Sequence, residues 1–320
     1  MAFHHTSRSS SQLPARLAGA LVLSVALGAS GFAQSSQLED DENFIDFYNL
    51  KDEDARWEIG VGFSAQDEGD LNKISGDLSI SRAFFEFNYE WPVADESSFS
   101  MGYREEHSNY DFDGPNAVGL ATPFREVKSS ALTANFLHAD EEGSWIANGS
   151  LTFGREQGVS PTEGLYGEAT AGKLWKVGED VELGLGLYMY SKLEDSAVFL
   201  PFPILNWQLT KSTRLGLVES SSPGYGLQFD LSERWDAYVV GNYTVRQYRL
   251  ADRTALTSGA VLDEDLNARA GLIYSGDALR FEVFGGLSRH EISIEANNGL
   301  AARDVSDPAP VIGASLSCIF

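Results

Sequence analysis

The chain has 320 residues and a formal charge of −24 at neutral pH, from 23 Lys and Arg against 47 Asp and Glu. Such an acidic chain lacks the basic surface that binding to DNA or RNA requires, so we expect no nucleic-acid partner. The mean hydropathy of −0.19 excludes a bundle of several transmembrane helices. It is compatible with membrane-spanning strands, in which only every second residue faces lipid.

Residues 1–33 have the pattern of a secretory signal peptide. A polar lead with two arginines precedes an apolar run over residues 17–29, and a small-x-small pattern that ends at Ala33 predicts cleavage ahead of Gln34. The apolar run is shorter than the roughly 20 residues that a membrane-spanning helix needs. The sequence therefore predicts export. The expected mature chain has 21 Lys and Arg against 47 Asp and Glu, a formal charge of −26.

Residues 34–55 are acidic but contain the apolar stretch Phe44-Ile45-Asp46-Phe47-Tyr48. Two interpretations of this segment stay open. It is either a disordered periplasmic lead or a short plug that folds into the interior of a barrel.

From residue 56 onward, segments with alternating apolar and polar residues recur between turn signals, which is the pattern of β-strands. In the clearest segment, Val181–Tyr190, the odd-numbered residues make one apolar face. Strands are predicted at 56–65, 77–91, 97–107, 126–138, 144–154, 164–177, 180–190, 198–209, 213–219, 224–231, 234–249, 266–275, 278–288 and 310–320. The pair 213–219 and 224–231 is the weakest of these.

Short and long connections alternate between these strands, which is typical of an outer-membrane barrel with short periplasmic turns and long external loops. Six tryptophans all fall at the short-turn ends, as expected for side chains that prefer one membrane interface. Residues 56–320 therefore predict an all-β fold, a single transmembrane antiparallel up-and-down β-barrel of about 12–14 strands. The longest loops are expected at 108–125, 250–265 and 289–309, and the acidic run 263–265 is interpreted as solvated loop charge.

Pro201 and Pro203 interrupt the strand predicted at 198–209. Proline has no N–H for the hydrogen-bond ladder, so a bulge or bend is expected there. The segment from Pro201 to Trp207, with the motifs at 223–227 and 247–250, is similar to a family of bacterial outer-membrane barrels of unknown function. The resemblance covers about residues 198–290 and implies an outer-membrane barrel, without any catalytic residue.

The C-terminal segment places Ile312, Ala314, Leu316, Cys318 and Phe320 on one face of a strand. This pattern, with its terminal Phe, resembles the assembly signal of outer-membrane barrel proteins. It implies the barrel assembly machinery, outer-membrane lipid and lipopolysaccharide as partners. Cys318 is the single cysteine, so no internal disulfide is expected.

The opposite faces of the predicted strands carry charged and amide side chains that we expect to line the barrel interior. They are Arg82, Glu86, Glu168, Arg246, Arg269, Arg280 and Glu282, with Asn88, Asn242 and Asn267. Charges of both signs in such positions either line an ion-permeable channel or pair into a network that closes the barrel, and both arrangements are compatible with a porin-like wall.

Catalysis and metal binding are not expected. His107 and His290 are placed at external strand ends and His138 on the lipid face, without the spacing of a catalytic or metal site. The preferred function is a passive channel or transporter for small solutes, in the outer membrane of a Gram-negative bacterium and without a cofactor. The alternatives are a non-conducting structural or surface-binding barrel with acidic external loops and, less favoured, an outer-membrane hydrolase.

Overall fold

The computed structural model describes residues 55–73, 76–94, 96–114, 124–140, 142–194, 196–218, 220–252, 259–296 and 299–320. The predicted signal peptide, its cleavage site between Ala33 and Gln34, and nearly all of the predicted lead at 34–55 lie outside the described residues. Among the described residues, no helix has the length and apolar character needed to cross a membrane.

The described chain is almost entirely strand. The elements are β1 (Arg56–Asp70), β2 (Asp77–Ala94), β3 (Ser97–Phe112), β4 (Glu126–Asp140), β5 (Gly143–Glu156), the 3₁₀ turn η3 (Pro161–Gly164), β6 (Leu165–Lys176), β7 (Val181–Tyr190), β8 (Val198–Thr210), β9 (Thr213–Val218), β10 (Gly224–Ser232), β11 (Trp235–Arg249), β12 (Ala260–Ser275), β13 (Leu279–Ala296), β14 (Gly299–Val305) and β15 (Ala309–Ile319).

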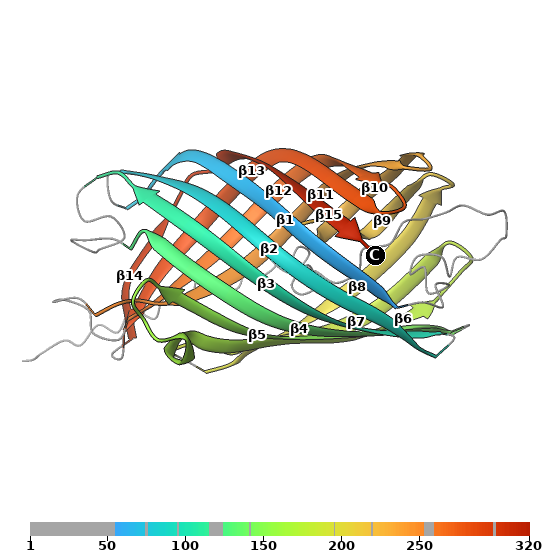
Figure 1. Ribbon diagram of the computed structural model, residues 1–320, viewed down its shortest axis with the longest axis horizontal. Helices are drawn as coiled ribbons and strands as arrows, with labels where there is room; N and C mark the ends of the chain where they lie inside the picture. The colour runs from blue at the N-terminus through green and yellow to red at the C-terminus, as the bar shows by residue number, and fades with distance from the viewer. Residues whose placement is uncertain are drawn as a thin grey trace, which may run out of the picture.

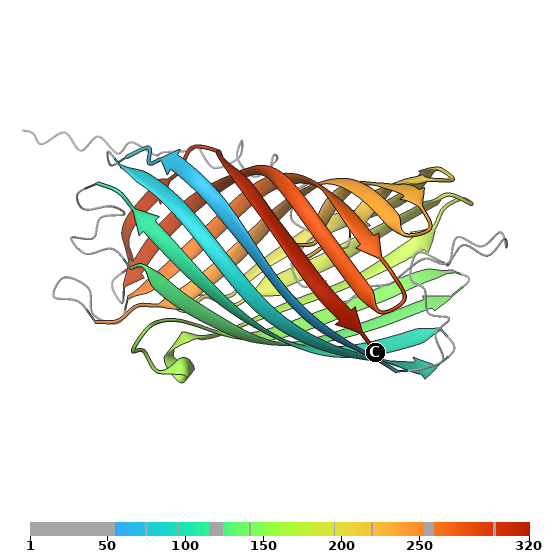
Figure 2. The same cartoon turned by 45° about the horizontal axis from the view of Figure 1, so that its top comes forward.

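Neighbouring strands pair antiparallel around one closed wall (Figures 1 and 2). The wall closes where β15 pairs with both β1 and β13. In the described chain β14 pairs with β13 alone and lies at one rim, so the barrel itself has 14 strands. The predicted fold class is confirmed, and the hairpin that decided between 12 and 14 strands forms as β9 and β10.

The outward faces of the strands form an apolar belt. Exposed outward side chains include Val61, Phe63, Met101, Leu132, Leu151, Leu183, Leu185, Leu187, Val239, Leu272, Leu287 and Ile312. Tryptophans lie at the strand ends beside the short turns, which we call the turn end; the opposite rim is the loop end. Exposed Trp57, Trp145, Trp175, Trp207 and Trp235 form a girdle there with the half-buried Trp91. An apolar belt with an aromatic girdle is the surface that a bilayer requires of a barrel.

Several strands run further toward the loop end than their alternation predicts. β3 continues to Phe112, β12 begins at Ala260 and β13 continues to Ala296. The interpretation of residues 263–265 as loop was therefore wrong. The outward face of β12 loses its apolar-to-lipid pattern there, because Leu262 packs against other strands instead of lipid.

The loop-end part of β11 curls across the barrel interior while it stays paired with β12 as far as Arg249↔Ala260. Its last residue, Arg249, forms a parallel bridge with Arg155 of β5. Val245 has the same strand parity as the lipid-facing Val239, yet it is buried in an apolar cluster with the inward side chains of β6, β7 and β8. The wall thus overlaps itself, with the outer face of β11 and β12 lying against the inner face of β6–β8.

Two contacts fix this crossing. The Gln247 side chain accepts a hydrogen bond from Leu193 N at 2.9 Å and donates one to Ser191 O at 2.8 Å, which ties β11 to the loop after β7. Beneath it, a Cβ at Gly154 would collide with the Gln247 carbonyl oxygen. Glycine at position 154 therefore permits the close approach of the two backbones.

The predicted bulge at Pro201 and Pro203 was wrong. The β7–β8 ladder runs without a register shift from Val181↔Trp207 to Tyr190↔Val198. The shift in β8 occurs instead between Gln208 and Thr210, on its β9 side. Residues two apart in a strand point their N–H groups to the same side, and for positions 201 and 203 this side faces away from β7. The ladder with β7 therefore needs no N–H group from either proline.

Candidate channel interior

The interior at the loop end is filled by apolar side chains. The buried cluster comprises Leu71, Leu78, Ile80, Tyr110, Phe112, Phe124, Val127, Tyr248, Leu250, Val261, Ile292 and Ile294. These residues come from the loop-end parts of strands that are far apart around the barrel. Their packing excludes water from that end of the interior and leaves the polar side chains beneath it in a dry environment.

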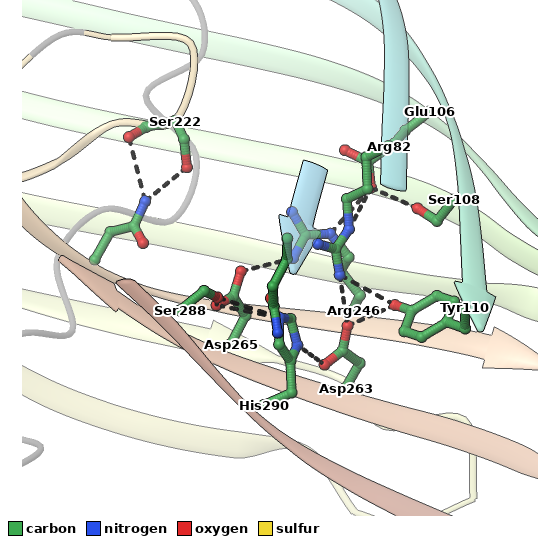
Figure 3. Close-up of polar contacts among 12 residues, drawn as sticks. Arg82, Glu106, Ser108, Tyr110, Ser222, Arg246, Asp263, Asp265, Ser288 and His290 are labelled. Carbon is green, nitrogen blue, oxygen red and sulfur yellow. Dashed lines mark hydrogen bonds and ion pairs between the residues drawn. The ribbon is translucent and has the colours of Figure 1, made fainter. Parts of the chain in front are cut away.

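A network of charged side chains crosses the barrel directly under this cluster (Figure 3). Asp263 of β12 is its centre and is fully buried, at 0% exposure. Its carboxylate accepts hydrogen bonds from Arg82 at 3.0 Å and from the Tyr110 hydroxyl at 2.5 Å. It also lies 2.6 Å from Nδ1 of His290, whose Nε2 faces the Gln66 amide oxygen at 2.7 Å.

A second set of contacts extends the network toward β3 and β11. Arg246 donates to Glu106 at 3.0 Å and lies 3.5 Å from Asp265. Ser288 donates its hydroxyl proton to Asp265 at 2.5 Å. Arg82 is 3.8 Å from Glu106 and so links the two sets.

The network is close to electrically balanced. Arg82 and Arg246 face three buried carboxylates, Glu106, Asp263 and Asp265, and His290 lies between the last two. A buried charge is tolerated only when it is paired and hydrogen-bonded, and removing one partner is strongly destabilising. The mutual pairing of these groups therefore holds five strands, β2, β3, β11, β12 and β13, in one arrangement across the interior.

Nearer the turn end, the β9–β10 turn bends into the barrel. Ser221 N donates to Glu282 of β13 at 2.6 Å, and Ser221 O accepts from Arg104 of β3 at 3.4 Å. Arg104 also pairs with Glu86 at 3.1 Å. Asn242 donates to Ser222 Oγ at 2.6 Å. The turn is thus held from three sides and narrows the interior at this level.

All of the predicted interior residues lie on inward faces, but they are not one site. Arg82 and Arg246 belong to the network, while Glu86 and Glu282 lie around the inward turn. Arg269 lies over the Phe284 ring, and Arg280 is on the same face of β13 as Glu282. Glu168 is separate from both groups and accepts a hydrogen bond from Tyr188 at 3.2 Å.

The sequence interpretation missed Asp263, Asp265 and His290, which were assigned to loops or to an external strand end. His290 in fact lies inside β13 and is fully buried. A signal for the two acids was present, because Asp263 and Asp265 continue the odd-numbered face of Asn267 and Arg269. Following that alternation four residues further would have placed both carboxylates inside the barrel.

Several inward polar atoms have no hydrogen-bond partner within the described chain. Both amide atoms of Asn267 are buried and unpaired, as are Arg269 Nε and Asn242 Oδ1. Asn242 of β11 is paired with Asn267 of β12, and Asn267 is paired with Ser288 of β13. The unpaired amide atoms of Asn242 and Asn267 therefore belong to neighbouring side chains. Buried polar groups normally have partners, and water or a polar solute in the interior would satisfy these.

Ser288, His290 and Asp263 have the order of a hydrolase triad, with Ser288 Oγ 3.2 Å from His290 Nε2. The hydrogen bonds do not suit that chemistry. Ser288 donates to Asp265 rather than to the imidazole, and His290 Nε2 faces the Gln66 oxygen. A histidine acts as general base only when a free lone pair on its ring nitrogen accepts the hydroxyl proton of the nucleophile. These residues are therefore part of the closing network.

No family model matches the chain, and no curated protein matches its sequence. The resemblance over residues 198–290 to a family of unknown function thus stays a prediction. Among solved structures, an outer-membrane channel from Pseudomonas putida F1 is 13% identical, with 82% of this chain and 95% of that chain covered and a TM-score of 0.48. The Pseudomonas putida toluene transporter TodX is 10% identical, with 92% and 96% covered and a TM-score of 0.38. The translocator domain of the autotransporter NalP from Neisseria meningitidis is 12% identical, with 83% and 90% covered and a TM-score of 0.37.

The chain is an outer-membrane β-barrel. Its strands follow one another around a closed wall in which most backbone groups are paired, and its outward belt is apolar. Barrels of this kind are the only strand structures that span a bilayer, and single-chain barrels of this size belong to the outer membrane of Gram-negative bacteria.

Proposed function

We propose that the barrel is a passive channel for small solutes, closed in the state described above. The observation that carries the proposal is a set of inward-facing amide and guanidinium atoms below the charged network, which are buried beside apolar side chains and have no protein partners within the described chain. A barrel that served only as a scaffold would gain stability by filling these positions with apolar side chains.

The size of the barrel supports the same proposal. Eight strands enclose an interior that side chains fill completely, and the diameter grows with the number of strands. With 14 strands, this barrel closes only by adding an apolar cluster, an inward turn and a crossing strand. The inward turn and the crossing part of β11 are held in place by side-chain hydrogen bonds, and the apolar cluster is built from side chains of the wall strands.

The charges of the interior predict weak ion selectivity. The mature chain is strongly acidic, but the buried Asp263, Asp265 and Glu106 are matched by Arg82 and Arg246. Cation preference requires a net excess of acid along the path itself. We therefore expect the ratio of cation to anion permeability to stay near unity.

Conductance of the purified protein in planar bilayers tests the proposal. We expect rare, brief openings of the wild-type protein and frequent openings when Gln247→Ala releases the crossing strand. Gln228→Ala, which alters an inward amide bonded to Arg214 at 2.8 Å near the turn end, serves as the matched control. If neither the wild-type protein nor either variant conducts at any applied voltage, the proposal that the barrel is a channel is wrong.

We also propose that residues 1–33 direct export, that residues 56–320 are the barrel domain, and that the barrel assembly machinery recognises the last strand. In support, Ile312, Leu316 and Phe320 are exposed on the outward face. Phe320 N donates to Trp57 O at 2.9 Å, so the final residue joins the closing seam. Phe320→Ala should slow insertion in cells, measured as loss of folded barrel from outer-membrane fractions.

A further inference from the structure

The wall is incomplete at one place in its strand pairing. β9 has only 6 residues and β10 only 9, and Figure 1 shows both confined to the turn end. β9 therefore pairs with β8 only from Trp207 to Thr210, and β10 pairs with β11 only up to Gly241. Along 198–205 of β8 and 243–248 of β11, no strand pairs with the intervening edge in the described chain.

The prolines of β8 lie on this edge. The even-numbered residues of β8 direct their backbone N–H and C=O groups toward β7. The odd-numbered residues direct theirs to the opposite side, toward the gap between β8 and β11. Leu205 O, for example, accepts a hydrogen bond from the Tyr225 hydroxyl at 2.6 Å. Pro201 and Pro203 occupy two of these odd positions and have no N–H to offer. β8 and β11 run in opposite directions, so without the prolines the β8 edge and the edge of β11 before Gln247 would suit an antiparallel ladder, whereas from Gln247 onward the backbone of β11 meets β5.

An open strand edge inside a bilayer is costly, because lipid offers no hydrogen bonds. Removing two donors with proline lowers that cost and at the same time prevents β11 from sealing the gap by pairing. The structure therefore has two independent devices, a short hairpin and a proline pair, that keep the wall from closing here. Neither device is needed in a barrel that transports solutes only along its axis.

Side chains, rather than a backbone ladder, close the gap. Behind the β8 edge, Phe202 and Ile204 pack with Tyr188, Tyr190 and Val245 in one buried cluster. The carboxylates beside this seam are held by neighbouring side chains, Glu168 by Tyr188, Glu182 by Asn206 and Glu264 by Tyr243. Side-chain rotation is far faster and cheaper than breaking a ladder, so the seam is suited to transient opening.

We propose that the seam between β8 and β11 is a lateral gate through which small apolar molecules pass between the barrel interior and the membrane. The inference rests on the proposed channel function and assigns its substrate class. The apolar and aromatic lining of the seam favours uncharged solutes, because an ion would lose its hydration there without gaining partners.

The first test restores the missing donors with the double variant Pro201→Thr and Pro203→Thr. Intact cells are mixed with N-phenyl-1-naphthylamine, an uncharged probe that fluoresces on entering a bilayer. Two restored ladder bonds should favour the sealed seam about tenfold. We expect the probe to enter about tenfold more slowly than with wild type, while ion conductance of the purified variant is unchanged. Pro92→Thr, in β2 near the turn end, should leave both readouts unchanged.

The second test is independent of whether the double variant seals. Single cysteines replace Val245, Val239 or Val240 of β11 in a Cys318→Ala background, and a membrane-soluble maleimide and a charged maleimide are applied. Val239 is on the lipid belt, Val240 is buried and faces inward, and Val245 is buried in the seam. The gate predicts that V245C reacts with the membrane-soluble reagent alone, more slowly than V239C and faster than V240C.

The outcomes separate the two proposals. A protein that conducts ions but does not accelerate probe entry, or a V245C that reacts no faster than V240C, would overturn the gate and leave the channel intact. Unchanged probe entry in the folded double variant would also count against the gate. Absence of conductance in every variant would overturn the channel on which the gate depends.

Discussion

Replacing Asp263 by Asn tests whether the charged network holds the interior closed. Asp263 accepts from Arg82 at 3.0 Å and from Tyr110 at 2.5 Å, and lies 2.6 Å from His290 Nδ1, with none of its surface exposed. At an effective dielectric constant of about 20, a pair of charges about 3 Å apart attracts by roughly 5 kcal/mol. The variant regains part of this lost attraction, because a neutral amide costs less to desolvate on burial than a carboxylate. Broken buried pairs cost about 3–5 kcal/mol in practice.

We therefore expect Asp263→Asn to lower the free energy of unfolding by about 3 kcal/mol. Urea unfolding in detergent micelles, followed by the emission of the girdle tryptophans, measures this. The neutral amide would also leave Arg82 without its closest partner, so channel openings should become more frequent in planar bilayers. Both effects come from one lost interaction and should appear together.

The matched control is Asp111→Asn. Asp111 is 3.8 Å from Arg125 in a pair whose side chains are 66% and 70% exposed, so its loss should cost at most about 0.5 kcal/mol. A stability loss for Asp263→Asn as small as that of the control would refute the view that the network fastens the strands together. A large loss of stability without any change in opening would refute its role in closing the channel.

Three further substitutions test other parts of the structure. Gly154→Val should push the crossing strand away from β5, costing about 1–3 kcal/mol by overpacking and increasing conductance, and an unchanged conductance would contradict the proposed role of the crossing. Asn267→Leu should leave the unfolding free energy unchanged or raise it by about 1 kcal/mol, because no hydrogen bond is lost. The same change should reduce conductance, because it makes the interior more apolar. A clear destabilisation would mean that the Asn267 amide has a partner. Trp145→Leu removes the ring beneath Lys173 Nζ, 4.6 Å away, and should cost about 0.5–1 kcal/mol in lipid bilayers, whereas a neutral result would argue against a contribution from the girdle.

The sequence by itself determined the class of fold, because period-2 alternation is a local property. A strand with one face to lipid must place apolar residues at every second position, as in Leu183, Leu185 and Leu187, and these side chains are exposed on the outer wall. The same alternation put Arg82 and Arg269 on inward faces. The tryptophans at short turns similarly reflect a preference of the side chain for the interface, which needs no knowledge of the neighbouring strands.

Only the tertiary structure decided which inward residues meet. Arg82 and Asp263 are 181 residues apart, and Gln66 and His290 are 224 residues apart, so their contacts exist only after the wall closes and curls inward. Strand alternation also fails where β11 and β12 leave the lipid, since Val245 and Leu262 then face protein. The role of Pro201 and Pro203 follows from the length of two other strands, which a local pattern does not record. Local periodicity thus determines which side a residue faces, and long-range closure determines what it faces.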